Sequence, residues 1–377
     1  MVRFIHTADW QLGMKREYLG EEAQARYCQD SFNAIRDLGD LAKQERAQFI
    51  VVSGDVFESN FVERKTVHRA LEAMAHVQVP IILLPGNHDP MDPSSIYKNK
   101  TFLECKPSNV TIVKDSTAID VSPGVQIIGA PWKSKRILSD ILSEACLALE
   151  PLPGVTRIML GHGVVSSLSM NREDPAIINL LTLENAINDG LIHYVALGDR
   201  HSVTSVGNTK RIWYSGSHLA TDFGEDRSGS VLVVDLDGDC SVQVKPLSFW
   251  QFVKKDFLIN SDADISTIES YLSSLANKDK TVVRLGLRGT VSAEGRAKLD
   301  EMLDNFGDLY ASIEEWEKDC DLVVSFGEEG IAALGLHGFA EETMKRLVEE
   351  SKATGTAGKV ASDAVALLHR LARGCTE

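Results

Sequence analysis

Phe49-Ile50-Val51-Val52-Ser53-Gly54-Asp55 is an apolar run that ends in a glycine and an aspartate, and this pattern decides the fold. Short runs of β-branched and aromatic residues are typical of strands buried on both faces. Four further runs lead into polar clusters in the same way: Val2 to Ile5 into Asp9, Ile81 to Leu84 into Gly86-Asn87-His88-Asp89, Ile158 to Leu160 into Gly161-His162-Gly163, and Tyr194 to Leu197 into Gly198-Asp199-Arg200-His201. Because ligands bind at the carboxyl ends of strands in layered α/β folds, the five clusters predict one shared site.

Helical stretches lie between several of these strands, notably Glu22 to Gln44 and Arg64 to His76, and Val125 to Ile128 adds a further strand. Short apolar strands that alternate with helices predict a layered α/β fold. We place this first domain at residues 1–247.

The rest of the 377-residue chain has a different texture and predicts a second domain and a tail. Residues 248–330 alternate in the order strand, helix, strand, helix, strand, which suits a small α+β domain. Residues 331–377 form a C-terminal helical segment with two helical stretches, Ala340 to Glu350 and Val360 to Arg373. The segment from Ser351 to Gly358 between them is expected to be a flexible connector.

Composition limits the function. Lys and Arg number 39 and Asp and Glu number 54, so the formal net charge is −15, which argues against binding nucleic acid through a basic surface. A phosphate substrate held by metal ions stays open. The 6 cysteines include no CxxC pair and are expected to be reduced thiols. No run approaches the ~20 apolar residues of a membrane span, and no signal peptide precedes the first strand, so we expect a cytoplasmic protein that binds no membrane.

The five clusters combine carboxylates, an amide and imidazoles. A lone Gly-Asp pair is usually a turn, and a lone loop histidine is usually just hydrogen-bonded. Together, however, these groups are the ligand set of a two-metal phosphoesterase, in which two ions about 3.5–4 Å apart polarise the phosphate and generate a hydroxide nucleophile. Mixed oxygen and nitrogen ligands suit Mn²⁺, Fe or Zn²⁺.

The ordered motifs resemble those of the calcineurin-like metallophosphoesterases. They are His6-Thr7-Ala8-Asp9-Trp10-Gln11-Leu12-Gly13, Ser53-Gly54-Asp55-Val56-Phe57, Gly86-Asn87-His88-Asp89, Gly161-His162-Gly163 and Ala196-Leu197-Gly198-Asp199-Arg200-His201. The flanking residues, including Trp213 to Ser217, are most similar to the SbcD-type DNA exonucleases of this family. The resemblance covers about residues 1–250 and implies a two-sheet α/β sandwich, with residues 248–330 as the capping domain.

The resemblance also implies roles for single residues. One metal ion would be bound by Asp9, Asp55 and His201, and a second by Asn87, His162 and Asp55, which bridges the two. His88 would protonate the leaving oxygen or stabilise its charge, and Asp89 would hold His88 in orientation.

Two positions depart from the family pattern. The first motif has Gln11 where the family has a histidine ligand, and the last has Asp199 where the family has another. Two nitrogens are thereby exchanged for two oxygens, with one added negative charge. One interpretation is retuning toward Mn²⁺ or Mg²⁺; the other is loss of one metal and of activity.

Three functions follow from these patterns. The leading hypothesis is a metal-dependent DNA exonuclease or endonuclease acting in DNA repair, as a homodimer with an SbcC-like coiled-coil ATPase. The alternatives are a phosphomonoesterase or cyclic-nucleotide phosphodiesterase on the same fold, and a metal-depleted subunit without activity.

Two further segments leave alternatives open. His218, Asp222 and Glu225 follow the Trp213 to Ser217 segment, and we expect them to lie in a surface loop rather than to supply a compensating ligand. The apolar stripe of residues 360–371 indicates either a helix that packs on its own domain or a helix that docks on the ATPase.

Overall fold

The computed structural model describes residues 1–16, 18–171, 173–316, 318–325 and 335–374, and the chain divides into two compact units. The first unit comprises Met1–Glu17 and Gln24–Trp250, and the second comprises Tyr18–Ala23 and Gln251–Glu377. The unit boundary therefore falls after Trp250, close to the boundary placed at 247. The boundary placed at 330 lies outside the described residues.

The first unit contains two six-stranded sheets. The first sheet has the order β12 (Asp239–Pro246), β11 (Ser230–Asp237), β1 (Val2–Thr7), β2 (Ile50–Ser53), β3 (Ile81–Leu84) and β4 (Val110–Ile112). The second has the order β5 (Ile119–Ser122), β6 (Val125–Gly129), β7 (Thr156–His162), β8 (Tyr194–Gly198), β10 (Ile212–Ser215) and β9 (Val203–Val206). Strands β1 to β4 run parallel, as do β6, β7, β8 and β10, so their carboxyl ends share one edge of each sheet.

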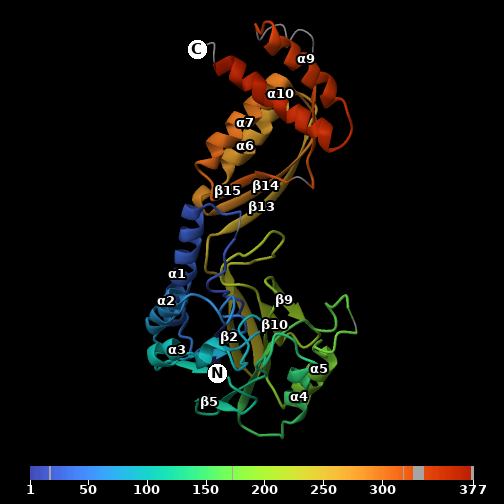
Figure 1. Cartoon of the computed structure of the whole chain (residues 1–377). Coiled ribbons are helices and arrows are strands. Elements are labelled where there is room, and N and C mark those ends of the chain that lie inside the picture. Colours follow the sequence, from blue (N-terminus) through green and yellow to red (C-terminus); the bar gives the residue numbers. More distant parts are fainter. Residues whose placement is uncertain (17, 172, 317, 326–334, 375–377) are drawn as a thin grey trace. The chain divides into compact units, whose positions relative to one another are not determined.

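Helices cover the outer face of each sheet, while the inner faces meet (Figure 1). The helices against the first sheet are α1 (Glu21–Glu45), α2 (Arg64–Ala75) and α3 (Lys100–Cys105), the last preceded by the 3-10 turn η1 (Ile96–Lys98). Those against the second sheet are α4 (Ile141–Leu147) and α5 (Leu180–Asn188). Between the sheets lie alternate residues of both, among them Phe4, Phe49 and Tyr194. The predicted two-sheet α/β sandwich is confirmed.

The second unit is built on one sheet whose described strand pairs are all parallel. Its strands are β13 (Gln251–Ile259), β14 (Thr281–Ser292), β15 (Ser312–Glu315) and β16 (Asp321–Ser325). Its first helices are α6 (Ile265–Ser274) and α7 (Ala293–Gly307), with the 3-10 turns η2 (Asp262–Asp264) and η3 (Lys278–Lys280). Leucine and isoleucine side chains of α6 and α7 pack on one face of this sheet. Parallel pairing is a detail that the prediction of a small α+β domain did not specify.

The chain then forms helices α9 (Phe339–Ser351) and α10 (Thr356–Gly374). Only residues 352–355 separate them, so the predicted connector is shorter than expected, because its last three residues begin α10. Helix α10 packs against α9 and α7 and buries Ala361 and Val365 (Figure 1). None of the described helices is long and apolar enough to span a bilayer.

Candidate metal centre

The polar clusters gather at the carboxyl ends of β1, β2, β3, β7 and β8. Backbone hydrogen bonds join the loops that carry them: the Asp9 amide donates to the Gly54 carbonyl (3.1 Å), and the Gln11 amide donates to the Asp55 carbonyl (2.9 Å). The Asp199 amide donates to both carboxylate oxygens of Asp9, at 3.0 and 3.1 Å. The site therefore draws on both sheets, and its backbone is held independently of any ligand.

Four residues of these clusters have a left-handed backbone conformation. Their φ angles are 52° for Asp9, 45° for Gln11, 51° for Asp55 and 91° for Asp199. Such angles are uncommon for residues with a side chain, and they concentrate at functional sites where the surroundings enforce them.

Two glycines bring the loops into contact. Gly54 has φ +95°, and a Cβ there would lie 2.0 Å from Nδ1 of His162. A Cβ on Gly86 would lie 2.2 Å from Oδ1 of Asp55. Both positions therefore need glycine, because any side chain would displace a residue of the site.

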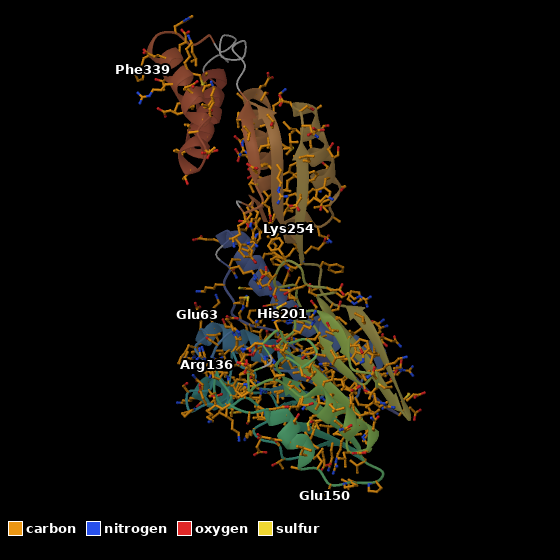
Figure 2. All side chains as sticks on the ribbon, turned by 90° about the vertical axis from the view of Figure 1, so that its right-hand side faces the viewer. Glu63, Arg136, Glu150, His201, Lys254 and Phe339 are labelled. Atoms are coloured by element: carbon orange, nitrogen blue, oxygen red, sulfur yellow. The ribbon has the colours of Figure 1, made fainter. Side chains whose placement is uncertain are left out.

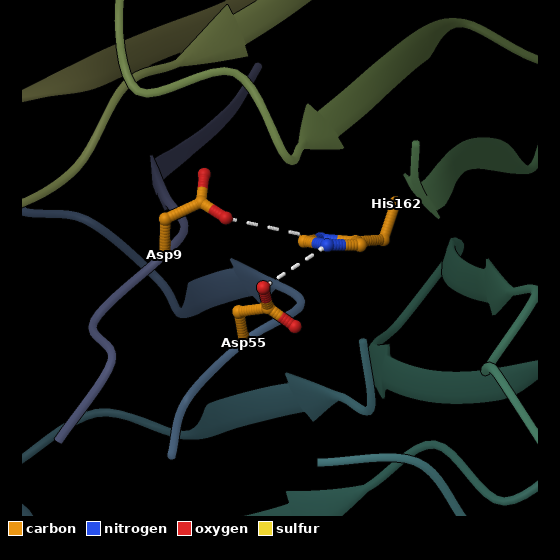
Figure 3. Close-up of side chains that lie close together, drawn as sticks. All are labelled: Asp9, Asp55 and His162. Atoms are coloured by element: carbon orange, nitrogen blue, oxygen red, sulfur yellow. Dashed lines mark ion pairs between the residues drawn. The ribbon is translucent and has the colours of Figure 1, made fainter. Parts of the chain in front are cut away.

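Asp9, Asp55 and His162 form a buried group whose ligand atoms all lie within 4.8 Å of one another (Figure 3). Nε2 of His162 is 3.4 Å from Oδ2 of Asp55, and Nδ1 of His162 is 3.9 Å from Oδ1 of Asp9. All three side chains are almost fully buried. The described residues thus include a preformed cluster of two carboxylates and one imidazole that can hold a cation.

The ring of His162 is fixed from both sides. Its Nδ1 lies 2.9 Å from the Ser53 carbonyl, which can only accept, so Nδ1 carries a proton. Its Nε2 faces Oδ1 of Asn87 at 2.7 Å, and Oδ1 of Asp199 lies 3.8 Å from the same nitrogen. With Nδ1–H held by a carbonyl, Nε2 is oriented as a metal ligand beside two oxygens.

His201 (labelled in Figure 2) comes from the loop after β8 and is held by a different group. Its Nδ1 lies 2.6 Å from the Thr221 hydroxyl and 3.0 Å from Oε1 of Glu225. Its Nε2 is 3.4 Å from the side-chain amide of Gln11. The structure therefore brings Gln11 and His201 together.

The charges of the site are unbalanced without a cation. Burial raises the pKa of Asp9 to about 7, against the opposing effect of His162 and His201, while Asp55 and Asp199 push it further up. Burial also raises the pKa of Asp55, but the neighbouring His162 and His88 outweigh it, so the pKa lies below its ordinary value. Carboxylates forced together in this way favour a bound cation.

His88 lies at the rim of the cluster and is partly exposed. Its Nδ1 is 3.0 Å from the Glu58 carbonyl and 3.5 Å from the Glu58 carboxylate, and its Nε2 is 3.9 Å from Oδ2 of Asp55. The hydrogen bond to Glu58 raises the pKa of His88 to about 9, with Asp55 adding to it and partial burial opposing it. The ring is therefore protonated near neutral pH.

Asp89 does not hold His88, so this part of the sequence prediction is wrong. Its buried carboxylate accepts hydrogen bonds from the Gly86 amide (2.8 Å), the Phe57 amide (3.0 Å) and the Tyr97 hydroxyl (2.5 Å). Asp89 therefore braces the loop that carries Asn87 and His88, while Glu58 takes the orienting role. Glu58 follows directly on the Ser53 to Phe57 motif, and that adjacency was the one sequence signal for it.

The loop after β10 is placed differently from the prediction as well. Glu225 is not a surface residue: only 8% of its side chain is exposed, and it contacts His201. His218 is buried, with Nε2 3.3 Å from the Ser31 carbonyl, whereas Asp222 is exposed as expected.

Comparisons with known proteins agree with this geometry. The calcineurin-like phosphoesterase model matches residues 2–234, which is more than half of the chain. The chain belongs to the calcineurin-like phosphoesterase family. The SbcD component of the nuclease SbcCD from Staphylococcus epidermidis is 23% identical over 288 residues, covering 68% of this chain and 73% of that protein.

Two solved structures are also similar. One is a Thermus thermophilus protein with TM-score 0.42 and 12% identity, covering 66% of this chain and 99% of its own. The other is a dimetal phosphatase from Danio rerio with TM-score 0.41 and 14% identity, covering 66% of this chain and 96% of its own.

Calcineurin-like phosphoesterases use divalent metals, and the residues present fit such ions. Oε1 of Gln11 is buried and has no hydrogen-bond partner among the described residues, which is the state of a ligand atom awaiting a cation. The imidazoles of His162 and His201 both keep Nδ1 engaged and Nε2 directed toward acceptor or amide groups. Carboxylate, amide and imidazole donors together suit a hard or borderline divalent ion.

Proposed function

We propose that this chain is a metal-dependent nuclease of the SbcD type that hydrolyses DNA phosphodiesters in DNA repair. The observation that carries the proposal is the convergence of Asp9, Asp55, Asn87, His162 and His201 on one edge of the sandwich, with the protonated His88 beside them. The similarity to the SbcD component of the nuclease SbcCD supports DNA as the substrate and the cytoplasm as the place of action.

The proposed ligands divide into two sets around Asp55. Asp9, Gln11 and His201 form the first set, since the Gln11 amide lies against Nε2 of His201. Asn87, His162 and Asp199 form the second set, since both oxygens lie near Nε2 of His162. Two divalent ions, with Mn²⁺ as the leading candidate and Mg²⁺, Fe or Zn²⁺ as alternatives, supply Lewis acidity and an activated water when bound.

The side chains outside these sets act on the substrate and on each other. His88 is placed to donate its Nε2 proton to the leaving oxygen, because Glu58 occupies its Nδ1 and keeps the ring charged. Asp89 and Tyr97 keep the His88 loop in place.

The test is a comparison of substrates. Purified protein should degrade linear DNA in the presence of Mn²⁺ much faster than it hydrolyses p-nitrophenyl phosphate or bis-p-nitrophenyl phosphate. Preference for the small esters would favour the phosphomonoesterase or cyclic-nucleotide phosphodiesterase alternative. Absence of hydrolysis with fewer than two bound ions per chain would favour a subunit without activity.

The departures at positions 11 and 199 yield a prediction of their own. Replacing both, as Gln11→His with Asp199→His, restores two nitrogen ligands and should shift metal preference from Mn²⁺ and Mg²⁺ toward Zn²⁺, because imidazole favours softer ions. If the site is only detuned, nuclease activity should rise by roughly tenfold, which is the lower end of what ligand-sphere changes produce. The measurements are metal content by elemental analysis and nuclease rates with each ion. Unchanged activity in a parent that already holds both ions would show that these positions do not limit catalysis.

Partners complete the proposal: an SbcC-like coiled-coil ATPase that supplies DNA affinity to this acidic chain, and a second copy of the chain in a homodimer. Helix α10 uses Ala361 and Val365 against its own unit, but Val360, Leu367 and Leu371 stay exposed at spacings of seven and four residues. An exposed apolar stripe of this kind fits the groove or face of a partner helix.

We predict that Leu367→Asp combined with Leu371→Asp abolishes co-purification with an SbcC-like ATPase from the same organism. Metal content should not change, because the substitutions lie in the second unit. Leu138→Asp with Leu181→Asp, two exposed leucines of the first unit, is the matched control. Point substitutions are a sharper test than removal of residues 351–377, which would also uncover the surface of α7. Undiminished binding of the ATPase would rule out this stripe as the docking surface.

A further inference from the structure

The loop of residues 216–229, after β10, places a buried carboxylate directly behind His201. Both oxygens of Glu225 are engaged: Oε2 accepts from the Thr221 amide (2.8 Å), while Oε1 accepts from the Thr221 hydroxyl and lies 3.0 Å from Nδ1 of His201. The loop is anchored at its far end, where the Asp226 amide donates to the Ser202 hydroxyl (2.9 Å) and its carbonyl accepts from Val203 (3.0 Å). Glu225 is therefore fixed in place from within its own loop.

The two candidate histidine ligands differ in what holds them. Nδ1 of His162 faces a neutral carbonyl, that of Ser53. Nδ1 of His201 faces a carboxylate that is mostly buried. A carboxylate behind an imidazole orients the ring, fixes the proton on Nδ1 and makes Nε2 a stronger electron donor.

This difference falls on the set of ligands that contains Gln11. Gln11 contributes a neutral amide oxygen there, which is a weaker ligand than an imidazole. Glu225 adds negative charge to the same set through His201, without occupying a ligand position.

We infer that Glu225 is a positioning residue that strengthens metal binding at the His201 side of the site and offsets the weak ligand Gln11. The inference rests on the proposed two-metal function and deepens it. Glu225 acts through His201 and touches neither metal nor substrate.

The test substitutes one oxygen of the carboxylate by nitrogen. Glu225→Gln keeps the side chain's length and can still accept from the Thr221 amide, so a purely structural role in the loop would leave it silent. If Glu225 acts through its charge on His201, the dissociation constant for Mn²⁺ at one of the two sites should rise by roughly 10- to 100-fold. Mn²⁺ binding is measured by electron paramagnetic resonance of the free ion, so the readout does not depend on hydrolysis.

Glu58→Gln is the matched control, because Glu58 is the carboxylate behind His88, which is not in either ligand set. It should leave both Mn²⁺ dissociation constants unchanged and lower kcat at saturating metal. Glu225→Gln should do the reverse, with nuclease activity that recovers as Mn²⁺ is raised. Thermal unfolding in the presence of EDTA checks that both variants fold.

The outcomes separate the inference from the proposed function. If the unsubstituted protein binds no Mn²⁺, the proposed function itself fails. If it binds two ions and Glu225→Gln binds them equally well, the positioning role is overturned. Should Glu225→Gln not fold, Glu225→Asp decides: its carboxylate is one methylene too short to keep the 3.0 Å contact, so an unchanged dissociation constant would likewise overturn the role.

Discussion

Asp55→Ala is expected to remove both metal ions at once and to reduce hydrolysis to background. Asp55 lies between the two proposed ligand sets, with Oδ2 3.4 Å from Nε2 of His162 and within 4.8 Å of the ligand atoms of Asp9. Loss of a shared carboxylate weakens both ions, whereas loss of an unshared ligand weakens one. The measurement is metal content of the purified variant by elemental analysis, followed by Mn²⁺ titration.

Asp222→Ala provides the control for this experiment. Asp222 is an exposed aspartate in the loop that carries Glu225, and its replacement should leave both ions bound. Asp55 also accepts a hydrogen bond from the His88 amide (3.0 Å), so folding of Asp55→Ala must be verified by thermal unfolding. One full equivalent of tightly bound metal in a folded Asp55→Ala protein would disprove the bridging role.

The sandwich could be predicted because its signal is local. Phe49, Ile50, Val51 and Val52 are fully buried, since the first sheet is covered by helices on one side and by the second sheet on the other. A strand buried on both faces must be apolar at every position, so its sequence identifies it without knowledge of its neighbours. The residues after each strand could be grouped for the same reason, because parallel strands end at a common edge.

The supporting residues could not be predicted, because their positions depend on loop conformation. Asp89 adjoins His88 in sequence, yet its carboxylate is taken up by the amides of Gly86 and Phe57 and by Tyr97. Glu225 follows the site motifs by more than twenty residues and reaches His201 only because its loop is held by its own hydrogen bonds. Sequence patterns thus identified the groups at strand ends but not the carboxylates that orient them.

His88→Ala is expected to lower the rate of hydrolysis by roughly 10²- to 10⁴-fold, the usual contribution of a positioned general acid. Metal content should stay nearly intact, because the ring of His88 faces Glu58 and approaches the ligand Asp55 no closer than 3.9 Å. The hydrogen bond from the His88 amide to Asp55 is made by the backbone and survives the substitution. The measurements are the metal content of the variant and single-turnover cleavage of linear DNA with saturating Mn²⁺.

His68→Ala is a suitable control, since His68 lies on the exposed side of α2 and its substitution should change neither quantity. A substrate with a better leaving group discriminates further: bis-p-nitrophenyl phosphate needs little protonation as its bond breaks, so His88→Ala should lose much less activity on it than on DNA. Equal losses on both substrates would point to charge stabilisation rather than proton donation. Loss of one or both ions in His88→Ala would contradict the placement of His88 outside the ligand sets, because a side chain that binds no metal cannot remove one by its absence.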